Sequence, residues 1–331
     1  MIDPQRRILD ALALCKRVLI TTHSRPDGDA LGTAAAMAMG LRRKQIDSEV
    51  LLFDRLPVKY AFLFNGNNIA HHDVEAGWPQ PYPLEKYDAL LVVDTGTWSQ
   101  LPGLREHLDG WKKPRLVLDH HLTQEDWADV KLVDTAAAAA GEIAAGLLAQ
   151  WKIPIDRSIA TALFVAIASD TGWFQFSNTR PATLRLAADL MEAGVDTDSI
   201  YQHLYQNERA ERLALQTRAQ DSLELLQNGR LAVMRVLKTD FEQTGAKPQD
   251  TENLINIPLQ IRTVEVSILM IEPLDDSPIR ISLRSKGQVD VARFAEQFGG
   301  GGHARAAGLK MLGPLAAAHG RIVTAMAKSL P

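Results

Sequence analysis

The feature that most constrains the fold is a series of short apolar runs in the first two-thirds of the chain, separated by segments with helical patterns. Five of these runs are strand candidates: residues 17–22, 49–53, 89–94, 115–119 and 131–133. Near-continuous apolar strands with helices between them are typical of a parallel sheet that is covered on both faces. The sequence therefore predicts an α/β fold built on a mostly parallel sheet.

Helical patterns occupy the segments between and after these strands. We predict helices at residues 29–45, 136–150, 157–169 and 181–193. The last of them starts with a proline and is followed by Gly194. Proline in the first turn and glycine just past the end are typical of helix boundaries.

The pattern changes after residue 228, and this change predicts a second, smaller α/β domain. Strands are expected at residues 231–237, 264–271 and 279–284, and helices at 291–298 and 315–327. A chain of 331 residues has room for two domains at about 150 residues each. We predict domains at 1–195 and 229–331, joined by a polar helical linker at 196–228.

Composition excludes several classes of protein. With 46% hydrophobic residues, the chain is too apolar to be disordered. Its net charge of −4 argues against a protein that coats long DNA or RNA through a broad basic surface. The single cysteine, Cys15, excludes an internal disulfide, a cysteine-rich zinc site and a CxxC motif. The sequence contains neither a signal peptide nor a membrane-spanning stretch, so we expect a cytoplasmic protein without membrane association.

Histidine and aspartate residues follow three of the predicted strands. The first strand runs into a loop with His23, Asp27 and Asp29. Asp94 ends the third strand, and Asp119 ends the fourth and is followed by two histidines. Because the carboxyl ends of parallel strands border the ligand crevice of an open sheet, we expect these side chains to converge.

Asp170 is a fourth acidic position, directly after the predicted helix at 157–169. A carboxylate there faces the negative end of the helix dipole, and several carboxylates in one crevice repel one another. Divalent cations between them remove this conflict. Nitrogen and oxygen ligands without a thiolate favour Mn²⁺, with Mg²⁺ or Co²⁺ as substitutes. Any single aspartate after a strand is more often a turn or cap residue, so the prediction depends on the whole set.

Five motifs in order resemble the DHH phosphoesterase superfamily. HSRPDGDALG (23–32), VVDTG (92–96), LDHH (118–121) and SDTGWF (169–174) are similar to its four DHH motifs. FGGGGHARAAG (298–308) resembles the glycine-rich signature of the DHHA1 domain. SDTGWFQFSNT and ISLRS are most similar to the branch that combines oligoribonuclease and 3′-phosphoadenosine 5′-phosphate (pAp) phosphatase activities. The resemblance implies a DHH catalytic domain at 1–195 and a DHHA1 substrate-binding domain at 229–331.

The resemblance also implies two bound metal ions with six protein ligands: His23, Asp27, Asp29, Asp94, His120 and Asp170. His23 and Asp27 are expected to hold one ion. Asp29 and His120 are expected to hold the other, with Asp94 as a bridge. Asp170 is expected to complete the ligand set of one of the two ions, and the sequence leaves open which ion.

The expected chemistry is hydrolysis of a phosphate ester by a two-metal site. Asp94, Asp119 and His121 are the expected catalytic residues. His121 is expected to face the scissile phosphate and to stabilise charge there or protonate the leaving alkoxide. Asp119 is expected to orient a histidine. Trp173 or Phe174, next to the fourth motif, is a candidate for stacking on a base, although most such aromatic residues belong to the core.

Substrate binding is expected in the second domain and in a cleft between the two domains. Glycines let backbone amides approach an anion closely, although a flexible turn before a strand is the plain alternative. Arg284 and Arg305 are expected to grip phosphate through paired donors. With the resemblance, six residues are predicted to bind phosphate and the terminal nucleotide: Arg284, Gly300, Gly301, Gly302, His303 and Arg305.

We therefore expect an enzyme that degrades short single-stranded RNA and linear dinucleotides to 5′-mononucleotides and removes the 3′-phosphate of pAp. The direction of cleavage is left open, and a homodimer is one option for its assembly. Within the superfamily, a single-strand DNA exonuclease or a cyclic-dinucleotide phosphodiesterase is an alternative. A nucleotide-binding sensor without turnover is the alternative from another class.

Overall fold

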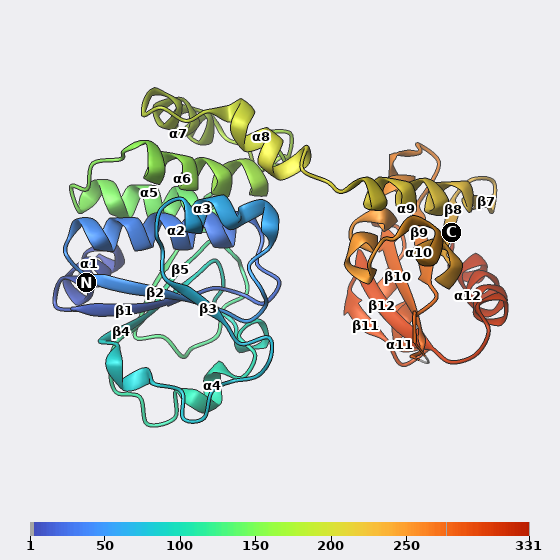
Figure 1. Ribbon diagram of the computed structural model, residues 1–331, viewed down its shortest axis with the longest axis horizontal. Coiled ribbons are helices and arrows are strands. Elements are labelled where there is room, and N and C mark those ends of the chain that lie inside the picture. Colours follow the sequence, from blue (N-terminus) through green and yellow to red (C-terminus); the bar gives the residue numbers. More distant parts are fainter. Residues whose placement is uncertain (1–2, 276, 331) are drawn as a thin grey trace. The chain divides into compact units, whose positions relative to one another are not determined.

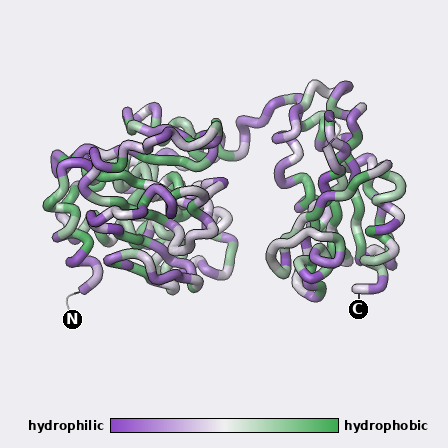
Figure 2. The backbone as a smooth tube through the Cα atoms, turned by 90° about the horizontal axis from the view of Figure 1, so that it is seen from below, coloured by the Kyte–Doolittle hydropathy of each residue, from purple (hydrophilic) through white to green (hydrophobic). Residues whose placement is uncertain are grey.

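The computed structural model describes residues 3–275 and 277–330 (Figure 1). Its contacts divide the chain into two units, Met1–Asn207 and Glu208–Pro331, and the chain between them is hydrophilic (Figure 2). This division lies inside the segment expected as a linker: α8 (Thr197–Tyr205) falls in the first unit and α9 (Ala210–Asp221) in the second. The domain limits expected from the sequence, 1–195 and 229–331, stay a prediction.

The first unit is built on a six-stranded sheet in the order β3-β2-β1-β4-β5-β6, and all its strands are parallel. The strands are β1 (Arg17–Thr21), β2 (Asp47–Leu52), β3 (His71–Asp73), β4 (Ala89–Val93), β5 (Arg115–Asp119) and β6 (Val130–Val133). The predicted parallel sheet is confirmed. The edge strand β3 was not predicted, because its three residues, His-His-Asp, are polar.

Helices cover one face of this sheet (Figure 1). They are α1 (Pro4–Ala13), α2 (Gly28–Arg43) and α5 (Ala140–Gln150), and α6 (Arg157–Asp170) packs on α2 and α5. Small residues let them pack closely: a Cβ on Gly32 of α2 would lie 2.4 Å from the carbonyl oxygen of Ala162 in α6. The short α3 (Ala61–Asn65), α7 (Pro181–Glu192) and α8 complete this part.

The opposite face differs from the prediction of helices on both sides. It is covered by irregular chain with 3₁₀ turns at Leu84–Lys86 and Trp98–Gln100 and by the one-turn helix α4 (Leu104–His107). Its core contains Tyr82, Tyr87 and Trp127 beside the strand residues. Aromatic side chains thus cover the area that longer helices were expected to cover.

The second unit contains a mixed sheet in the order β11-β12-β10-β9-β8-β7. Its strands are β7 (Glu224–Leu226), β8 (Leu231–Val236), β9 (Val266–Ile271), β10 (Ile279–Ser285), β11 (Gly301–His303) and β12 (Ala306–Met311). Only the β8–β9 pair is parallel among the pairings found in the described residues. Four helices accompany it: α9, α10 (Lys238–Thr244), α11 (Val291–Glu296) and α12 (Leu315–Ser329), with 3₁₀ turns at Pro248–Thr251 and Leu254–Gln260.

Across residues 3–275 and 277–330, every helix is too short or too polar to cross a membrane.

Candidate metal centre

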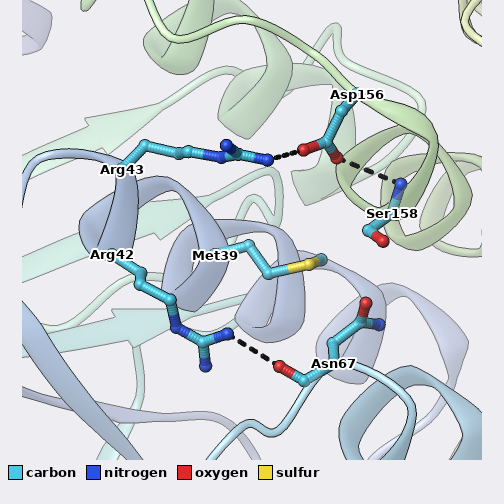
Figure 3. Close-up of a pocket in the computed structure, with 6 residues that line it drawn as sticks. All are labelled: Met39, Arg42, Arg43, Asn67, Asp156 and Ser158. Atoms are coloured by element: carbon cyan, nitrogen blue, oxygen red, sulfur yellow. Dashed lines mark hydrogen bonds and ion pairs between the residues drawn. The ribbon is translucent and has the colours of Figure 1, made fainter.

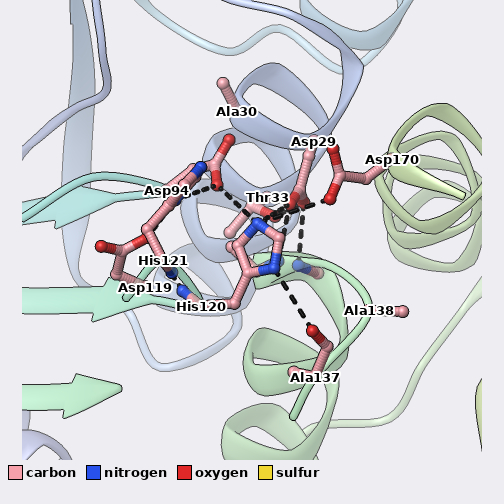
Figure 4. A network of polar contacts seen from close by, with 12 residues as sticks. Asp29, Ala30, Thr33, Asp94, Asp119, His120, His121, Ala137, Ala138 and Asp170 are labelled. Carbon is pink, nitrogen blue, oxygen red and sulfur yellow. Dashed lines mark hydrogen bonds and ion pairs between the residues drawn. The ribbon is translucent and has the colours of Figure 1, made fainter. Parts of the chain in front are cut away.

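The strand order of the first sheet reverses between β1 and β4, and the candidate site lies where these strands end. A crevice at such a reversal is the usual ligand position in open parallel sheets. His23 comes two residues after β1, Asp94 follows β4 directly, and Asp119 is the last residue of β5. Figure 4 shows side chains from the ends of β4 and β5 and from α2 and α6 pointing toward one another.

His23, Asp27 and Asp94 form what we call the first donor group. One ligand atom from each lies within 4.8 Å of the other two. His23 Nε2 is 3.4 Å from Asp94 Oδ2 and 4.0 Å from Asp27 Oδ1. This is the arrangement expected for a cation held by one imidazole and two carboxylates.

Asp29, His120 and Asp170 form the second donor group, with the same 4.8 Å limit. His120 Nε2 is 3.6 Å from Asp29 Oδ2 and 3.4 Å from Asp170 Oδ2. It is also 3.4 Å from Asp94 Oδ1. The two oxygens of Asp94 therefore face different histidines, which puts this carboxylate between the two donor groups.

The backbone fixes Asp94 and Asp27 in these positions. Asp94 has a φ of 61°, a left-handed conformation that costs a residue with a side chain about 1–2 kcal/mol. Its N–H donates to Leu118 O of β5 at 2.8 Å. Asp27 caps α2, because its Oδ1 accepts the N–H groups of Asp29 and Ala30 at 3.0 and 3.1 Å. Both carboxylates are thus held before any ligand is present.

Both donor-group histidines have the hydrogen bond that is usual for metal-ligating imidazoles. His23 Nδ1 lies 2.9 Å from Ser24 O, and His120 Nδ1 lies 3.3 Å from Ala137 O. Because a carbonyl oxygen only accepts, these Nδ1 atoms carry hydrogen. In a neutral imidazole, Nε2 is then left with a free lone pair that faces the carboxylates.

The charges of the site favour cations. Burial raises the pKa of Asp29 well above its ordinary value, and the charges of Asp94 and Asp170 raise it further. Burial also raises the pKa of Asp170, to about 6. Burial lowers the pKa of His23 and His120, but Asp94 outweighs it and raises both to about 9. Protons therefore balance the carboxylates when no metal is bound, and Asp94 Oδ1 is buried without a hydrogen-bond partner. The residues fit divalent ions.

Asp29 connects the site to α5. Its side chain is fully buried. Its Oδ2 accepts the N–H of Ala140 at 2.6 Å, and its Oδ1 accepts the N–H of Gly141 and the hydroxyl of Thr33, both at 3.0 Å. The residue before α5 is Ala139, whose side chain makes no cap, so Asp29 of α2 caps this helix from another element.

Asp119 holds the histidine pair rather than joining either donor group. It is fully buried, and its Oδ1 accepts from His121 Nδ1 and His120 N, both at 2.8 Å. Gln124 Nε2 donates to its other oxygen. The hydrogen bond that His121 donates to Asp119 raises the pKa of His121, whose side chain is 55% exposed. His121 Nδ1 is 3.7 Å from Asp94 Oδ1, so this imidazole lies beside the donor groups.

The sequence analysis missed four residues that support the site. Thr33 and Gly141 bind Asp29, Gln124 binds Asp119, and Asn178 donates to the backbone of Asp170. Asn178 lies in SDTGWFQFSNT (169–179), the longer segment that the resemblance quotes, although no role was assigned to it. Gly141 acts through a backbone amide and Gln124 through a loop contact, so no sequence signal marked them. Thr33 is one helical turn from Asp29 in α2, a spacing at which side chains meet, and was overlooked.

The predicted substrate residues lie in the second unit. Arg284 is partly buried, and its Nη1 donates to Leu283 O at 3.1 Å. Burial lowers its pKa, and no ion pair with a carboxylate is found for it in residues 3–275 and 277–330. Arg305 is exposed and lies near Gly287, where a Cβ would be 3.0 Å from Arg305 Nη2. The side chain of His303 lies outside what the structure describes.

Packing explains two of the predicted phosphate-binding glycines. A Cβ on Gly300 would lie 2.3 Å from Gly308 O, and one on Gly302 would lie 2.5 Å from Ala306 O. The Gly300 N–H already donates to Ala295 O at 2.9 Å. A Cβ on Gly301 would meet nothing within 4 Å. The hairpin of β11 and β12 therefore requires glycine at 300 and 302 whatever binds there.

The aromatic residues after Asp170 also differ from expectation. Trp173 and Phe174, the candidates for base stacking, pack against the core, and Trp173 lies 5.2 Å from the Tyr201 ring. Phe176 is 60% exposed and lies against Gly172, where a Cβ would be 2.4 Å from Phe176 Cζ. Of these three, Phe176 is the ring available to a ligand.

A cavity of about 280 Å³ lies at the C-terminal end of α2, the end away from Asp29 (Figure 3). Its lining residues are Met39, Arg42, Arg43, Asn67, Asp156 and Ser158. Arg42 donates to Asn67 O at 2.8 Å, and Arg43 pairs with Asp156. Both guanidinium groups therefore already have partners within the protein.

Two family models match the chain. The model of the DHH family, N-terminal domain, matches residues 17–167, and that of the DHHA1 domain matches residues 228–319. The protein of Bacillus subtilis (strain 168) named bifunctional oligoribonuclease and PAP phosphatase NrnA is 24% identical over 310 residues, which are 91% of this chain and 91% of that protein.

Solved structures share the fold. An exopolyphosphatase-related protein from Bacteroides fragilis aligns with a TM-score of 0.88 at 21% identity and covers 98% of this chain and 96% of that one. The exonuclease RecJ bound to manganese aligns with a TM-score of 0.59 at 17% identity and covers 99% of this chain and 94% of that one. At these identities, the two structures support the architecture and not the activity.

Proposed function

Because this chain belongs to the DHH family and carries a DHHA1 domain, we propose that it is a metal-dependent phosphoesterase. Its substrates are very short RNA and linear dinucleotides, which it cleaves to 5′-mononucleotides, and pAp, whose 3′-phosphate it removes. The name of the Bacillus subtilis relative supports this choice of substrates. The observation that carries the proposal is the position of Asp94, whose two oxygens face His23 and His120.

Two divalent ions occupy the donor groups in this proposal, with Mn²⁺ as the first choice and Mg²⁺ or Co²⁺ as substitutes. The first donor group holds one ion, the second holds the other, and Asp94 serves both. The set of imidazole nitrogens and carboxylate oxygens supports it, as does the manganese named for the RecJ structure. Such ions supply Lewis-acid activation of water and neutralise charge on the phosphoryl oxygens.

His121 handles the proton of the leaving group. Asp119 holds its Nδ1 and raises its pKa, which increases the protonated fraction near neutral pH. A protonated imidazole beside the scissile bond can donate from Nε2 to the departing alkoxide oxygen. Asp119 is thereby a positioning residue, since it acts on the reaction through His121.

The second unit supplies groups for phosphate and nucleotide binding in this proposal. Arg284 and Arg305 are the cationic side chains, and Gly301 is the glycine whose surroundings leave room for a ligand. Gly300, Gly302 and His303 remain predicted members of this set. The cytoplasmic location and the option of a homodimer also stay predictions from the sequence.

A turnover panel tests the function. The full-length protein is assayed with Mn²⁺, Mg²⁺ or Co²⁺ on RNA of two to five nucleotides, longer RNA, short DNA, pAp and pGpG. We expect Mn²⁺-dependent release of 5′-mononucleotides from the shortest RNA and of phosphate from pAp, with long RNA turned over poorly. Binding of these nucleotides without hydrolysis under all three metals would instead support the sensor alternative and reject the enzyme.

A further inference from the structure

One short stretch of backbone supports two of the three residues in the second donor group. Residues 137–141, which we call the alanine segment, join β6 to the first turn of α5. Ala137 O accepts from His120 Nδ1 at 3.3 Å. The N–H groups of Ala140 and Gly141 donate to Asp29 at 2.6 and 3.0 Å. Any shift of the alanine segment therefore moves His120 and Asp29 together (Figure 4).

Asn178 connects this segment to the third residue of the group. It lies between α6 and α7, and its Nδ2 donates to Ala138 O and to Asp170 O, both at 3.1 Å. Both hydrogens of one amide nitrogen are thus used to join the end of α6 to Ala138, which lies 40 residues before Asn178. The side-chain oxygen, Oδ1, is buried and has no hydrogen-bond partner among the described residues.

A second contact holds the same backbone position from its other side. Glu142 Oε2 accepts the N–H of Ala138 at 3.1 Å and also pairs with Arg180 Nη2 at 2.6 Å. Ala138 is therefore bound at its N–H and at its C=O by contacts that lead to residues 178 and 180. The alanine side chain contributes no polar group, so its role depends on these backbone contacts.

The supports found for the first donor group do not involve Asn178 or the alanine segment. His23 is held by Ser24 O, and Asp27 by the first turn of α2. Asp94 is held through its backbone by Leu118. None of the hydrogen bonds found for Asn178 in residues 3–275 and 277–330 leads to these three residues.

We propose that Asn178 is a positioning residue for only one of the two metal ions, the one held by the second donor group. Asn178 fixes the distance between Asp170 and the alanine segment, and through that segment it fixes His120 and Asp29. This inference rests on the proposed function, because it requires that the two donor groups bind metal.

Calorimetric titration of metal-free protein with Mn²⁺ tests this role. We expect two binding events in the unmodified protein. In Asn178→Ala, one event keeps its affinity and the other weakens about 10–100-fold, the usual effect of removing a group that orients a metal ligand. Electron paramagnetic resonance at one and two equivalents of Mn²⁺ should show less of the coupled two-ion signal in the variant. A merely structural role would lower the melting temperature without this selective loss.

Asn67→Ala is the matched control, because Asn67 Nδ2 also donates to one backbone carbonyl, Leu63 O, at 2.8 Å in the same unit. It should leave both Mn²⁺ affinities unchanged.

Asn178→Asp keeps the shape of the side chain but loses both donors, and it replaces Asn178→Ala if the alanine variant does not fold. Equal weakening of both sites, or of neither, in a folded variant would overturn the inference and leave the proposed function standing. If the unmodified protein binds no Mn²⁺, the proposed function and this inference both fail.

Discussion

Asp94 is the residue on which both halves of the candidate centre depend. It is almost fully buried, has a left-handed backbone, and faces one histidine with each oxygen. Burial opposes its charge, but the neighbouring imidazoles of His120 and His23 outweigh this effect and lower its pKa. A carboxylate kept ionised in a buried position is suited to bind cations.

Asp94→Asn should therefore reduce metal affinity and activity more than the loss of a residue that binds only one ion. We expect both Mn²⁺ sites to weaken and kcat/KM on dinucleotides to fall about a thousandfold or more, because a metal contributes several kcal/mol to stabilising the transition state. Asp73→Asn, at an exposed carboxylate in β3, is the control and should keep full activity. Retention of most Mn²⁺-dependent turnover in Asp94→Asn would contradict the bridging role.

His121 should behave differently from the donor-group histidines. Its Nδ1 is engaged by Asp119, and its side chain is 55% exposed. We expect His121→Ala to lower kcat about 10²–10⁴-fold, the usual contribution of a general acid, while both Mn²⁺ affinities stay within a few-fold. The test compares titration calorimetry with steady-state kinetics. A loss of metal binding equal to the loss of rate would make His121 a ligand instead.

Phe176 is the aromatic side chain that we expect to contact a base. It is 60% exposed six residues after Asp170, and stacking of a base on an aromatic ring contributes about 1–3 kcal/mol. Phe176→Ala should raise KM for dinucleotides about 5–100-fold with little change in kcat. Leu184→Ala removes another exposed apolar side chain, on α7, and is expected to leave KM unchanged. An unchanged KM in Phe176→Ala would exclude the stacking role.

The donor-group side chains could be predicted from the sequence because each follows an apolar run, and the ends of parallel strands meet. Their supports could not. Asn178 and Gln124 act by hydrogen bonds to groups outside their own segments, and hydrophobic patterns contain no information about such partners. The role of each side chain as a metal ligand stays a prediction.

At the scale of elements, the strands and helices predicted for the first unit have the expected bounds to within a few residues, whereas α1 and β3 were not predicted. Among the predicted elements the largest difference is at α5, which begins at Ala140 although the helical pattern starts at 136. The residues before it stay extended or turned because Asp29 binds the N–H groups of Ala140 and Gly141 and fixes the helix start there. A tertiary contact thus sets a boundary that local pattern cannot show.

Replacing each of two glycines of α5 with alanine should have opposite effects on the stability of the fold. A Cβ on Gly141 would lie 2.6 Å from Ala166 Cβ, so Gly141→Ala forces α5 and α6 apart and should cost about 1–3 kcal/mol of stability. The substitution should also weaken Mn²⁺ binding, because it displaces the N–H of residue 141, which binds Asp29. A Cβ on Gly146 would meet nothing within 4 Å, so Gly146→Ala should stabilise the helix by about 0.5–1 kcal/mol. Denaturant unfolding of both variants checks the signs.

At the scale of the whole molecule, the site makes the stability of the first unit depend on pH and metal. His23 and His120 have pKa values of about 9 in the metal-free fold, against an ordinary value of 6.5. The fold thus binds protons more tightly than the unfolded chain. The contribution of these two histidines to stability is fully present below pH 6.5 and is lost as the pH rises to about 9. Asp170, with a pKa raised to about 6, acts in the same direction at lower pH.

Bound Mn²⁺ should reverse this trend, because it displaces the same protons and binds more tightly as the pH rises. At a hundredfold excess over its dissociation constant, one ion adds about 2.7 kcal/mol. Hydrogen exchange of the full chain at pH 6.5 and 8.5, with and without Mn²⁺, measures both effects separately in each unit. Peptides from α5 and α6 should lose protection at the higher pH without metal and regain it with Mn²⁺. Peptides from α12 should show neither change, and the same response in α12 would show that the effect does not arise at the donor groups.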